Sequence, residues 1–265
     1  MEISVILLTW NSEKFILDCI DSTISAVKDF DYEIIVIDNH STDNSKNLIK
    51  PYLTNRRIKL FEMDKNMGVA GGRNFGIKES KGNFVWLLDI DTITNKSAFK
   101  AMIKAMQDNP DCGICGCKLI HSSGEVQNSC RKLPLLRYKV LNTLAAKLNN
   151  TIATKAITRL NSKQFYSEQM NGNKPFEVEY IIGACQLIRK TVINQIGLLD
   201  EKIFYGPEDA DYCLRAKKAG WKILYLPYVS FIHEYQRISN KQLMSKMGKV
   251  HIKALLYFWW KHKII

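Results

Sequence analysis

The sequence Leu87-Leu88-Asp89-Ile90-Asp91-Thr92 places two carboxylates one residue apart, directly after the apolar run Phe84–Leu88. A buried strand that ends in such a pair presents carboxylates at the edge of a sheet. Mg²⁺ and Mn²⁺ prefer oxygen ligands, and Mg²⁺ is often held by one or two carboxylates together with substrate phosphates. The pair therefore predicts a seat for a divalent metal and a diphosphate. The alternative is an ordinary turn or cap role for the aspartates.

A second acidic group follows Pro207, where Glu208, Asp209 and Asp211 occupy three of four positions. Acidic residues are common in the first turn of a helix because they interact favourably with the helix dipole. An adjacent Glu-Asp pair in an acid-poor stretch also suits a general base, which removes a proton from an acceptor hydroxyl.

A glycine-rich segment, Asn66–Gly76, leads into a predicted helix. Small residues permit close backbone approach, a helix N-terminus favours anions, and Arg73 adds a cationic fork for phosphate. The glycine spacing matches neither the dinucleotide fingerprint nor the P-loop, so neither cofactor family is indicated.

Two further polar positions follow predicted strands. Asp38 ends one strand, and Ser41 or Asp43 is expected to cap the next helix, which leaves Asp38 for a ligand such as a base N–H. His233 follows the apolar run Tyr228–Ile232. A lone histidine here is either a structural residue or a metal or phosphate contact.

The chain has seven cysteines, an odd number that fits reduced thiols better than a disulfide framework. Cys112, Cys115 and Cys117, with His121 nearby, raise the possibility of a zinc site. Their spacing matches none of the usual zinc patterns, and alternation along a half-buried strand is the simpler interpretation.

Strand and helix patterns alternate through the first half of the chain, which predicts an α/β fold with a mainly parallel twisted sheet flanked by helices. Ligands of such sheets bind beyond the carboxyl ends of the strands. In this sequence, three polar clusters lie at predicted strand ends. The predicted strands are 3–9, 33–37, 58–61 and 84–88, and the predicted helices are 12–27, 43–52 and 70–79.

The rest of the chain is expected to divide into a less regular insertion over the site (122–179), an ordered part (180–234) and a basic tail (235–265). The insertion carries an amphipathic patch near Leu135–Leu148. A strand at Tyr180–Arg189 and a helix at Asp209–Ala219 are predicted in the ordered part.

The net charge of +12 and the pI of about 9.3 suggest an anionic partner. Six lysines and no acid lie between Ser239 and the C-terminus. A helical apolar face ends in Phe258-Trp259-Trp260, which is typical of an interfacial membrane helix, although a helix packing its aromatics on the domain is the alternative. Nucleic-acid binding is disfavoured because the charge is concentrated in this tail and not interleaved with base-stacking aromatics.

The 265 residues are 46% apolar, enough for a substantial core. No apolar run reaches the length of a membrane span, and the acidic Glu2 with the short run Ile3–Leu8 does not fit a signal peptide. A cytoplasmic protein, peripheral on the inner membrane face, is expected.

Taken together, these segments resemble family 2 of the glycosyltransferases, the inverting enzymes with the GT-A fold, and most closely its rhamnosyltransferase-like branch. The resemblance covers about Glu2–Glu234 in the family's motif order. It rests on the segments Val5–Asn11, Ile35–Asp43, Asn66–Asn74, Leu88–Asp91 and Glu208–Arg215.

The resemblance implies a Rossmann-like nucleotide-binding half (1–121) plus an acceptor half within one domain (1–234). It also implies a nucleoside-diphosphate sugar donor, UDP- or dTDP-linked, with dTDP-rhamnose as one candidate. The acceptor it implies is a glycan or lipid-linked glycan in bacterial surface polysaccharide synthesis, and the cofactor is Mg²⁺ or Mn²⁺. Asp209 would be the base, supported by Glu208, while Asp91 and His233 would contact the metal. The nucleotide sugar would be bound by Thr9, Asn11, Asp38, Gly68, Arg73, Asn74 and Asp89.

Two positions depart from the family pattern. Trp10 stands where many members have Tyr or Phe, and Glu234-Tyr235-Gln236-Arg237 replaces a continuation rich in His, Gly and Ser. The second departure puts the phosphate-binding loop in doubt, although Arg237 could substitute electrostatically.

Two rival interpretations remain. A sugar nucleotidyltransferase shares the fold type, metal and diphosphates, but needs a basic glycine-rich loop near the first strand, which Thr9–Glu13 lacks. A non-catalytic binding protein with the same fold is disfavoured because both acidic pairs are intact.

Overall fold

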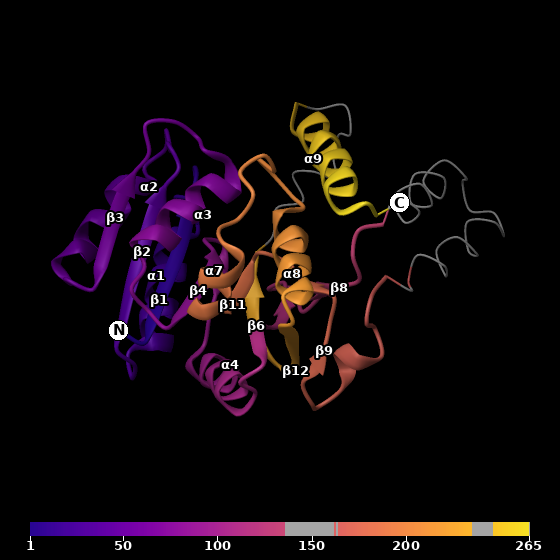
Figure 1. Ribbon diagram of the computed structural model, residues 1–265. Coiled ribbons are helices and arrows are strands. Elements are labelled where there is room, and N and C mark those ends of the chain that lie inside the picture. Colours follow the sequence, from indigo (N-terminus) through magenta and orange to yellow (C-terminus); the bar gives the residue numbers. More distant parts are fainter. Residues whose placement is uncertain (136–161, 163, 235–245, 265) are drawn as a thin grey trace.

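The computed structural model describes residues 1–135, 162, 164–234 and 246–264 (Figure 1). Its centre is a ten-stranded sheet in the order β3-β2-β1-β4-β11-β6-β12-β5, with β7 and β9 paired at its side. The two halves of this sheet are built differently, and the strand ends of both contribute to one acidic region.

The first half of the sheet is parallel throughout. Its strands are almost continuously apolar and buried, as expected of parallel strands covered on both faces. In spatial order they are β3 (Ile58–Glu62), β2 (Tyr32–Asp38), β1 (Ile3–Thr9) and β4 (Phe84–Asp89).

Helices cover both faces of these strands. Along β1, Ile3, Val5 and Leu7 join one core cluster while Ile6 joins the other, because successive side chains point to opposite faces. Stacking of Trp86 on Phe99, with ring centroids 4.4 Å apart, fixes α4 on the first face. The helices of this half are α1 (Ile16–Val27), α2 (Ser45–Ile49), the 3₁₀ helix η1 (Lys50–Thr54), α3 (Gly68–Glu79) and α4 (Lys96–Asp108).

The second half of the sheet is mixed. Strand β11 (Cys185–Arg189) runs antiparallel between β4 and β6 (Cys112–Ile120), and β6 is parallel to β12 (Lys222–His233). The short β5 (Thr92–Ile93) pairs with the end of β12, so that His233 lies opposite Thr92. This long-range pairing brings a histidine from the end of the domain next to the Asp89–Asp91 segment.

The strand predicted over 180–189 is two strands, β10 (Tyr180–Ile181) and β11, separated by a turn. The predicted helix 209–219 is α8 (Glu208–Lys218). The remaining elements are β7 (Val126–Gln127), β8 (Cys130–Arg131), η2 (Gln169–Asn171), β9 (Phe176–Glu177), α7 (Lys190–Ile196) and α9 (Lys246–His262).

Helix α9 lies next to α8, at the top of the view in Figure 1. Ala254, Leu255 and Phe258 are buried on its inner face, as the packing alternative predicts. In the described part of the chain, no helix combines the length and the hydropathy needed to cross a membrane. Most of the predicted patch 135–148, Leu243 and the segment 235–237 lie outside the described residues.

Candidate active site

The first polar cluster lies where β1 and β2 end side by side. Thr9 and Asp38 are paired in the strand register, and both are buried. Asp38 accepts the Ser41 N–H through Oδ2 at 3.1 Å. In contrast, Asp38 Oδ1 and Thr9 Oγ1 have no hydrogen-bond partner among the described residues. Buried polar atoms normally find partners, so this strand edge offers two unsatisfied groups to a polar ligand.

Neighbouring side chains shape the loops around that edge. Asn11 adopts a positive φ of 52° and its Oδ1 accepts the Thr42 N–H at 2.8 Å, which ties the loop after β1 to the loop after β2. Asp43 accepts the N–H groups of Glu13 and Ser45, in line with its predicted local role at the start of α2. Trp10 is 51% exposed.

The glycine-rich helix α3 packs closely on the sheet. A Cβ at Gly72 would stand 2.3 Å from Leu8 Cδ1, so a larger residue here would force the Leu8 side chain to move. Gly68, at its N-terminus, has a φ of +71° and lies under the Phe204 carbonyl, which accepts the Val69 N–H. In this structure the glycines therefore serve helix–sheet packing and the docking of the loop that precedes α8.

Arg73, on α3, is the buried centre of the acidic region, with a 2% exposed side chain. Its Nη2 donates to Asp89 Oδ1 and to the Gly183 carbonyl oxygen at 2.8 Å, and its Nη1 lies 3.8 Å from Glu208 Oε1. The planar guanidinium suits such a multiple contact. One cation thus links the strand-end aspartate to the acidic pair of α8.

Asn74, the next residue on α3, faces elsewhere. Its side-chain nitrogen donates to the Leu199 carbonyl oxygen and to Glu201, and its oxygen accepts the Leu199 N–H, all at 2.9 Å. The amide is committed at both ends to the loop after α7.

The metal-type cluster consists of Asp89, Asp91 and His233, whose ligand atoms lie within 4.8 Å of one another. His233 Nε2 is 3.2 Å from Asp91 Oδ1 and 3.9 Å from Asp89 Oδ2. On the other side of the ring, His233 Nδ1 is 2.7 Å from Gln127 Oε1. Two carboxylates and an imidazole form a donor set that suits Mn²⁺ or Mg²⁺ completed by phosphate oxygens.

The charge around His233 reflects this cluster. Burial lowers the pKa of the imidazole, but the hydrogen bond and charge of Asp91, with the charges of Asp89 and Glu234, raise it more, so that the net pKa is raised. The Glu234 N–H also donates to the Asp91 carbonyl oxygen, which fixes the backbone of the loop against the end of β12.

The second acidic pair, Glu208 and Asp209, occupies the first turn of α8. Asp209 accepts the Gly183 N–H at Oδ2 (2.9 Å) and the Ala210 N–H at Oδ1 (2.7 Å). Glu208 is 6% exposed, and its Oε2 has no hydrogen-bond partner among the described residues. A buried carboxyl, Glu208, and a half-buried one, Asp209, thus lie beside a cation that does not fully satisfy them.

Burial, followed by the charge of Asp209, raises the pKa of Glu208 to about 7, against the opposing charge of Arg73. Burial also raises the pKa of Asp209, although the Gly183 and Ala210 N–H groups lower it. A carboxyl whose pKa is raised toward neutrality is a better proton acceptor than an ordinary aspartate. The pair is therefore suited to general-base chemistry.

Comparison with known proteins agrees with this geometry. The family model described as "Glycosyl transferase family 2" matches residues 4–197. The chain belongs to this family.

Among curated relatives, the poly(ribitol-phosphate) β-N-acetylglucosaminyltransferase TarS of Staphylococcus aureus is 26% identical over 216 residues. The match covers 77% of this chain and 35% of TarS, so the chain spans about a third of that relative's length.

Solved structures of glycosyltransferases share the GT-A fold of this chain. TarS 1–349 of S. aureus in complex with UDP-GlcNAc matches with a TM-score of 0.60 and 20% identity, over 91% of this chain and 62% of that one. GalNAc-T7 with UDP, GalNAc and Mn²⁺ matches with a TM-score of 0.71 and 16% identity, over 98% of this chain and 48% of that one.

Two residues of the candidate site were not predicted from the sequence. Gly183 accepts from Arg73 and donates to Asp209, but it is a lone glycine inside what reads as a continuous strand. Gln127 holds His233, but it lies 106 positions away from it. The isolated glycine was an available signal for a strand break; Gln127 had none.

The cysteine segment has a different character. Cys112, Cys115 and Cys117 are buried in β6, and burial raises the pKa of each thiol, to about 12 for Cys112. Zinc binds the thiolate, which such burial disfavours. His121 instead pairs with Glu234 at 3.1 Å.

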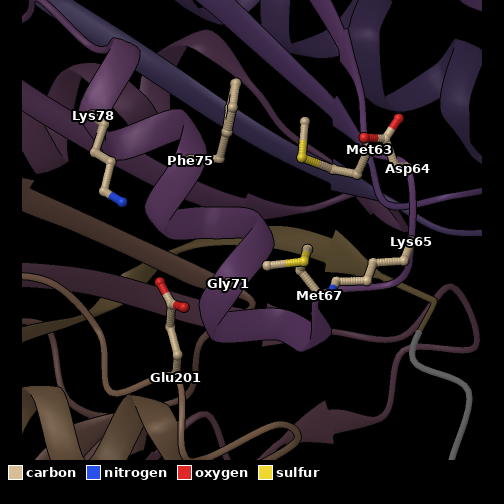
Figure 2. A pocket seen from close by; sticks show the side chains of 8 residues that line it. All are labelled: Met63, Asp64, Lys65, Met67, Gly71, Phe75, Lys78 and Glu201. Atoms are coloured by element: carbon tan, nitrogen blue, oxygen red, sulfur yellow. The ribbon is translucent and has the colours of Figure 1, made fainter.

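A cavity of about 460 Å³ lies beside α3. Figure 2 shows the side chains that line it. Lys78 and Glu201 face one another across it, and Met63, Met67 and Phe75 supply apolar walls. None of its lining residues belongs to the two acidic pairs, so the chemistry assigned above lies elsewhere.

Proposed function

We propose that this protein is an inverting glycosyltransferase that moves a sugar from a UDP- or dTDP-linked donor to a hydroxyl of a glycan or lipid-linked glycan. The observation that carries the proposal is the contact of Arg73 with both Asp89 and Glu208, which sets the metal-type cluster beside a second pair of acids with raised pKa values. Metal-assisted departure of a diphosphate and deprotonation of a hydroxyl need two such centres close together.

The base of the donor nucleotide would lie at the ends of β1 and β2. Asp38 Oδ1 is a buried acceptor without a partner among the described residues, suited to the imide N–H of uracil or thymine, and Thr9 Oγ1 lies beside it. Asn11 would line the same pocket. The solved structure of TarS in complex with UDP-GlcNAc favours a uridine nucleotide for this chain. The sequence resemblance suggests dTDP-rhamnose as the alternative.

Mg²⁺ or Mn²⁺ would be held by Asp91 and His233, with Asp89 between them and the donor; when bound, it neutralises charge on the diphosphate leaving group. Arg73 keeps Asp89 oriented and adds positive charge behind the diphosphate. Gly68 would approach the ribose. The committed amide of Asn74 gives it a positioning role for the loop after α7.

Asp209 would accept the proton of the acceptor hydroxyl. The Gly183 N–H fixes one of its oxygens, and the adjacent Glu208 supports the site electrostatically. The acceptor oxygen then attacks the anomeric carbon from the face opposite the diphosphate. This single displacement inverts the configuration and needs no covalent intermediate.

A lipid-linked acceptor for surface polysaccharide would place the protein at the cytoplasmic face of the membrane, in peripheral contact with it. The relation to TarS supports a polymer or glycan acceptor.

The test is nucleoside-diphosphate release from a panel of UDP-, dTDP- and GDP-sugars, with Mn²⁺, Mg²⁺ or EDTA and membrane-extracted glycolipid as acceptor. We expect one donor to give release that depends on both metal and acceptor, with an inverted linkage in the product. Release of pyrophosphate from sugar phosphate and nucleoside triphosphate would instead identify a nucleotidyltransferase. Absence of both release and nucleotide binding would identify a non-catalytic relative.

A further inference from the structure

Helix α9 exposes a row of large apolar side chains on its outer face. Ile252 is 41% exposed, Leu256 57% and Trp260 76%. They are spaced four residues apart, so they form one ridge along the helix. Exposed apolar residues scattered singly need no explanation, but three in line on one helix indicate a surface that contacts something.

Lysines share this outer face. Lys249 and Lys253 are exposed and fall within the same sector of the helix as the apolar ridge, and the exposed Lys263 directly follows the last helical residue. The sequence from 235 to 265 contains no acidic residue that could neutralise them. A mixed face of lysine and large apolar residues, with tryptophan at one end, matches the chemistry of a bilayer interface, where aromatic rings lie among headgroups and lysines reach phosphates.

The inner face of α9 holds the helix rigidly against the domain. Lys261 Nζ and His262 Nε2 contact the buried Asp211 Oδ1 of α8, at 2.6 and 2.7 Å. Lys261 and Tyr257 also reach Asp200. Among the described side chains, Lys261 and His262 thus turn inward to carboxylates, whereas Lys249 and Lys253 face solvent.

The same helix touches the loop that leads to the proposed base. His251 Nδ1 lies 3.1 Å from the Gly206 carbonyl oxygen, two residues before Glu208. Since Asp211 is in the first turn of α8, α9 is attached near both sides of the acidic pair. A partner bound to the outer face of α9 would therefore have a fixed orientation relative to the candidate active site.

We propose that the outer face of α9, defined by Ile252, Leu256 and Trp260 with Lys249, Lys253 and Lys263, docks on an anionic phospholipid bilayer. The ridge enters the headgroup region and the lysines contact lipid phosphates. A protein groove that receives an amphipathic helix typically covers a continuous apolar stripe, whereas here lysines lie along the stripe itself. Docking itself does not depend on the proposed function. Only its consequence rests on that function: docking holds the acceptor side of the enzyme toward a lipid-linked substrate.

The experiment measures sedimentation of the full chain with vesicles of phosphatidylglycerol and phosphatidylcholine, and with phosphatidylcholine alone, at 0.1 M salt. We expect binding to the anionic vesicles that weakens as salt is raised. Replacing Lys249, Lys253 and Lys263 by Gln should weaken binding about 100-fold, since each lysine near an anionic surface contributes roughly fivefold.

Matched controls separate this face from charge and hydrophobicity in general. Replacing three exposed lysines elsewhere, Lys28, Lys81 and Lys174, removes the same charge and should leave most of the binding. Leu256→Gln should weaken binding about tenfold, whereas Leu53→Gln, at a leucine 38% exposed on η1, should not. All these side chains are exposed, so the melting temperature should not change.

Tryptophan fluorescence reports the orientation. Vesicles should shift the emission to the blue in the wild type and in Trp10→Phe, and this shift should be lost in Trp260→Phe. Equal losses in the α9 and control variants, a shift that depends on Trp10, or self-association through α9 without vesicle binding would overturn the proposal. Donor hydrolysis without lipid tests the proposed enzyme activity separately, so the two failures are distinguishable.

Discussion

The two acidic pairs of this protein differ in their surroundings although both consist of neighbouring carboxylates. Asp89 and Asp91 end a strand, with side chains 38% and 19% exposed, and each has a cationic or cation-forming neighbour. Glu208 and Asp209 form a more enclosed pair at the start of a helix, with Glu208 buried and Asp209 half-buried, and their pKa values are raised. A more accessible carboxylate pair beside an imidazole suits a metal, whereas an enclosed pair whose pKa values are raised suits proton transfer. The difference in environment assigns different chemistry to similar residues.

The largest expected effect comes from removing the proposed base. Asp209→Asn keeps the size of the side chain and one of its two acceptor oxygens, but it cannot act as a carboxylate base. We expect transfer to fall about 10²- to 10⁴-fold, the usual contribution of general-base catalysis, with nucleotide binding retained. Initial rates and calorimetric UDP titration measure the two effects. A variant that keeps its turnover would remove Asp209 from this role.

The link between the pairs should matter for folding. Arg73→Gln leaves Glu208 buried beside Asp209 without its cation, and removal of one partner of a buried charge pair typically costs about 3–5 kcal/mol. We expect a loss of stability of this order in urea unfolding. Arg73→Lys, which retains charge but cannot make the forked contacts, should recover only part of it. Unchanged stability of Arg73→Gln would mean that the pairs are independent.

The metal affinity expected of the Asp89–Asp91–His233 cluster can be lowered without replacing any of these three residues. Gln127→Leu removes the oxygen that orients the His233 ring through Nδ1, and loss of such a support typically lowers metal affinity about 10- to 100-fold. Mn²⁺ titration followed by electron paramagnetic resonance measures the change. Val126→Ala, at the exposed neighbour on β7, is the control and should have no effect. Wild-type affinity in Gln127→Leu would assign Gln127 no positioning role.

The smallest effect concerns stability and pH. The pKa of Glu208 is raised from 4.5 to about 7 in the folded chain. Burying Glu208 therefore costs no stability below pH 4.5, where it is protonated in both states, and the free energy of unfolding falls as the pH rises from 4.5 through 7. Glu208→Gln removes this cost. Calorimetry should show a melting temperature a few °C above wild type at pH 8 and little difference at pH 4.5. A larger gain at the acidic pH would reverse the sign and contradict the buried-acid assignment.

The position of Asp89 and Asp91 at a strand end was predicted from the sequence, because an apolar strand followed by two aspartates is a local pattern. The parallel half of the sheet followed for the same reason. The environment of Glu208 and Asp209 depends on contacts distant in the sequence: Gly183 holds Asp209, and Arg73 of α3 reaches Glu208 of α8 on the same face of the sheet. The sequence predicts that the glycine-rich segment contacts phosphate. In the structure, Gly72 allows α3 to pack on Leu8, a contact between helix and strand that the sequence alone does not show.

The tail shows the same limit. Its basic, aromatic composition was compatible with both packing and interfacial binding, since a helical pattern alone does not tell which carboxylates it will meet. The buried Asp211 settles which lysine points inward, and the exposed ridge remains for the bilayer test.

The most direct measurement is Mn²⁺ binding in the presence of UDP, followed by electron paramagnetic resonance, in the wild type, Asp91→Asn and Asp209→Asn. Different roles for the two acidic pairs predict that Asp91→Asn loses the bound Mn²⁺ signal while Asp209→Asn keeps it, although both lose transfer. Retention of Mn²⁺ by Asp91→Asn, or its loss in Asp209→Asn, would contradict the assignment of metal binding to the strand-end pair and proton transfer to the enclosed pair.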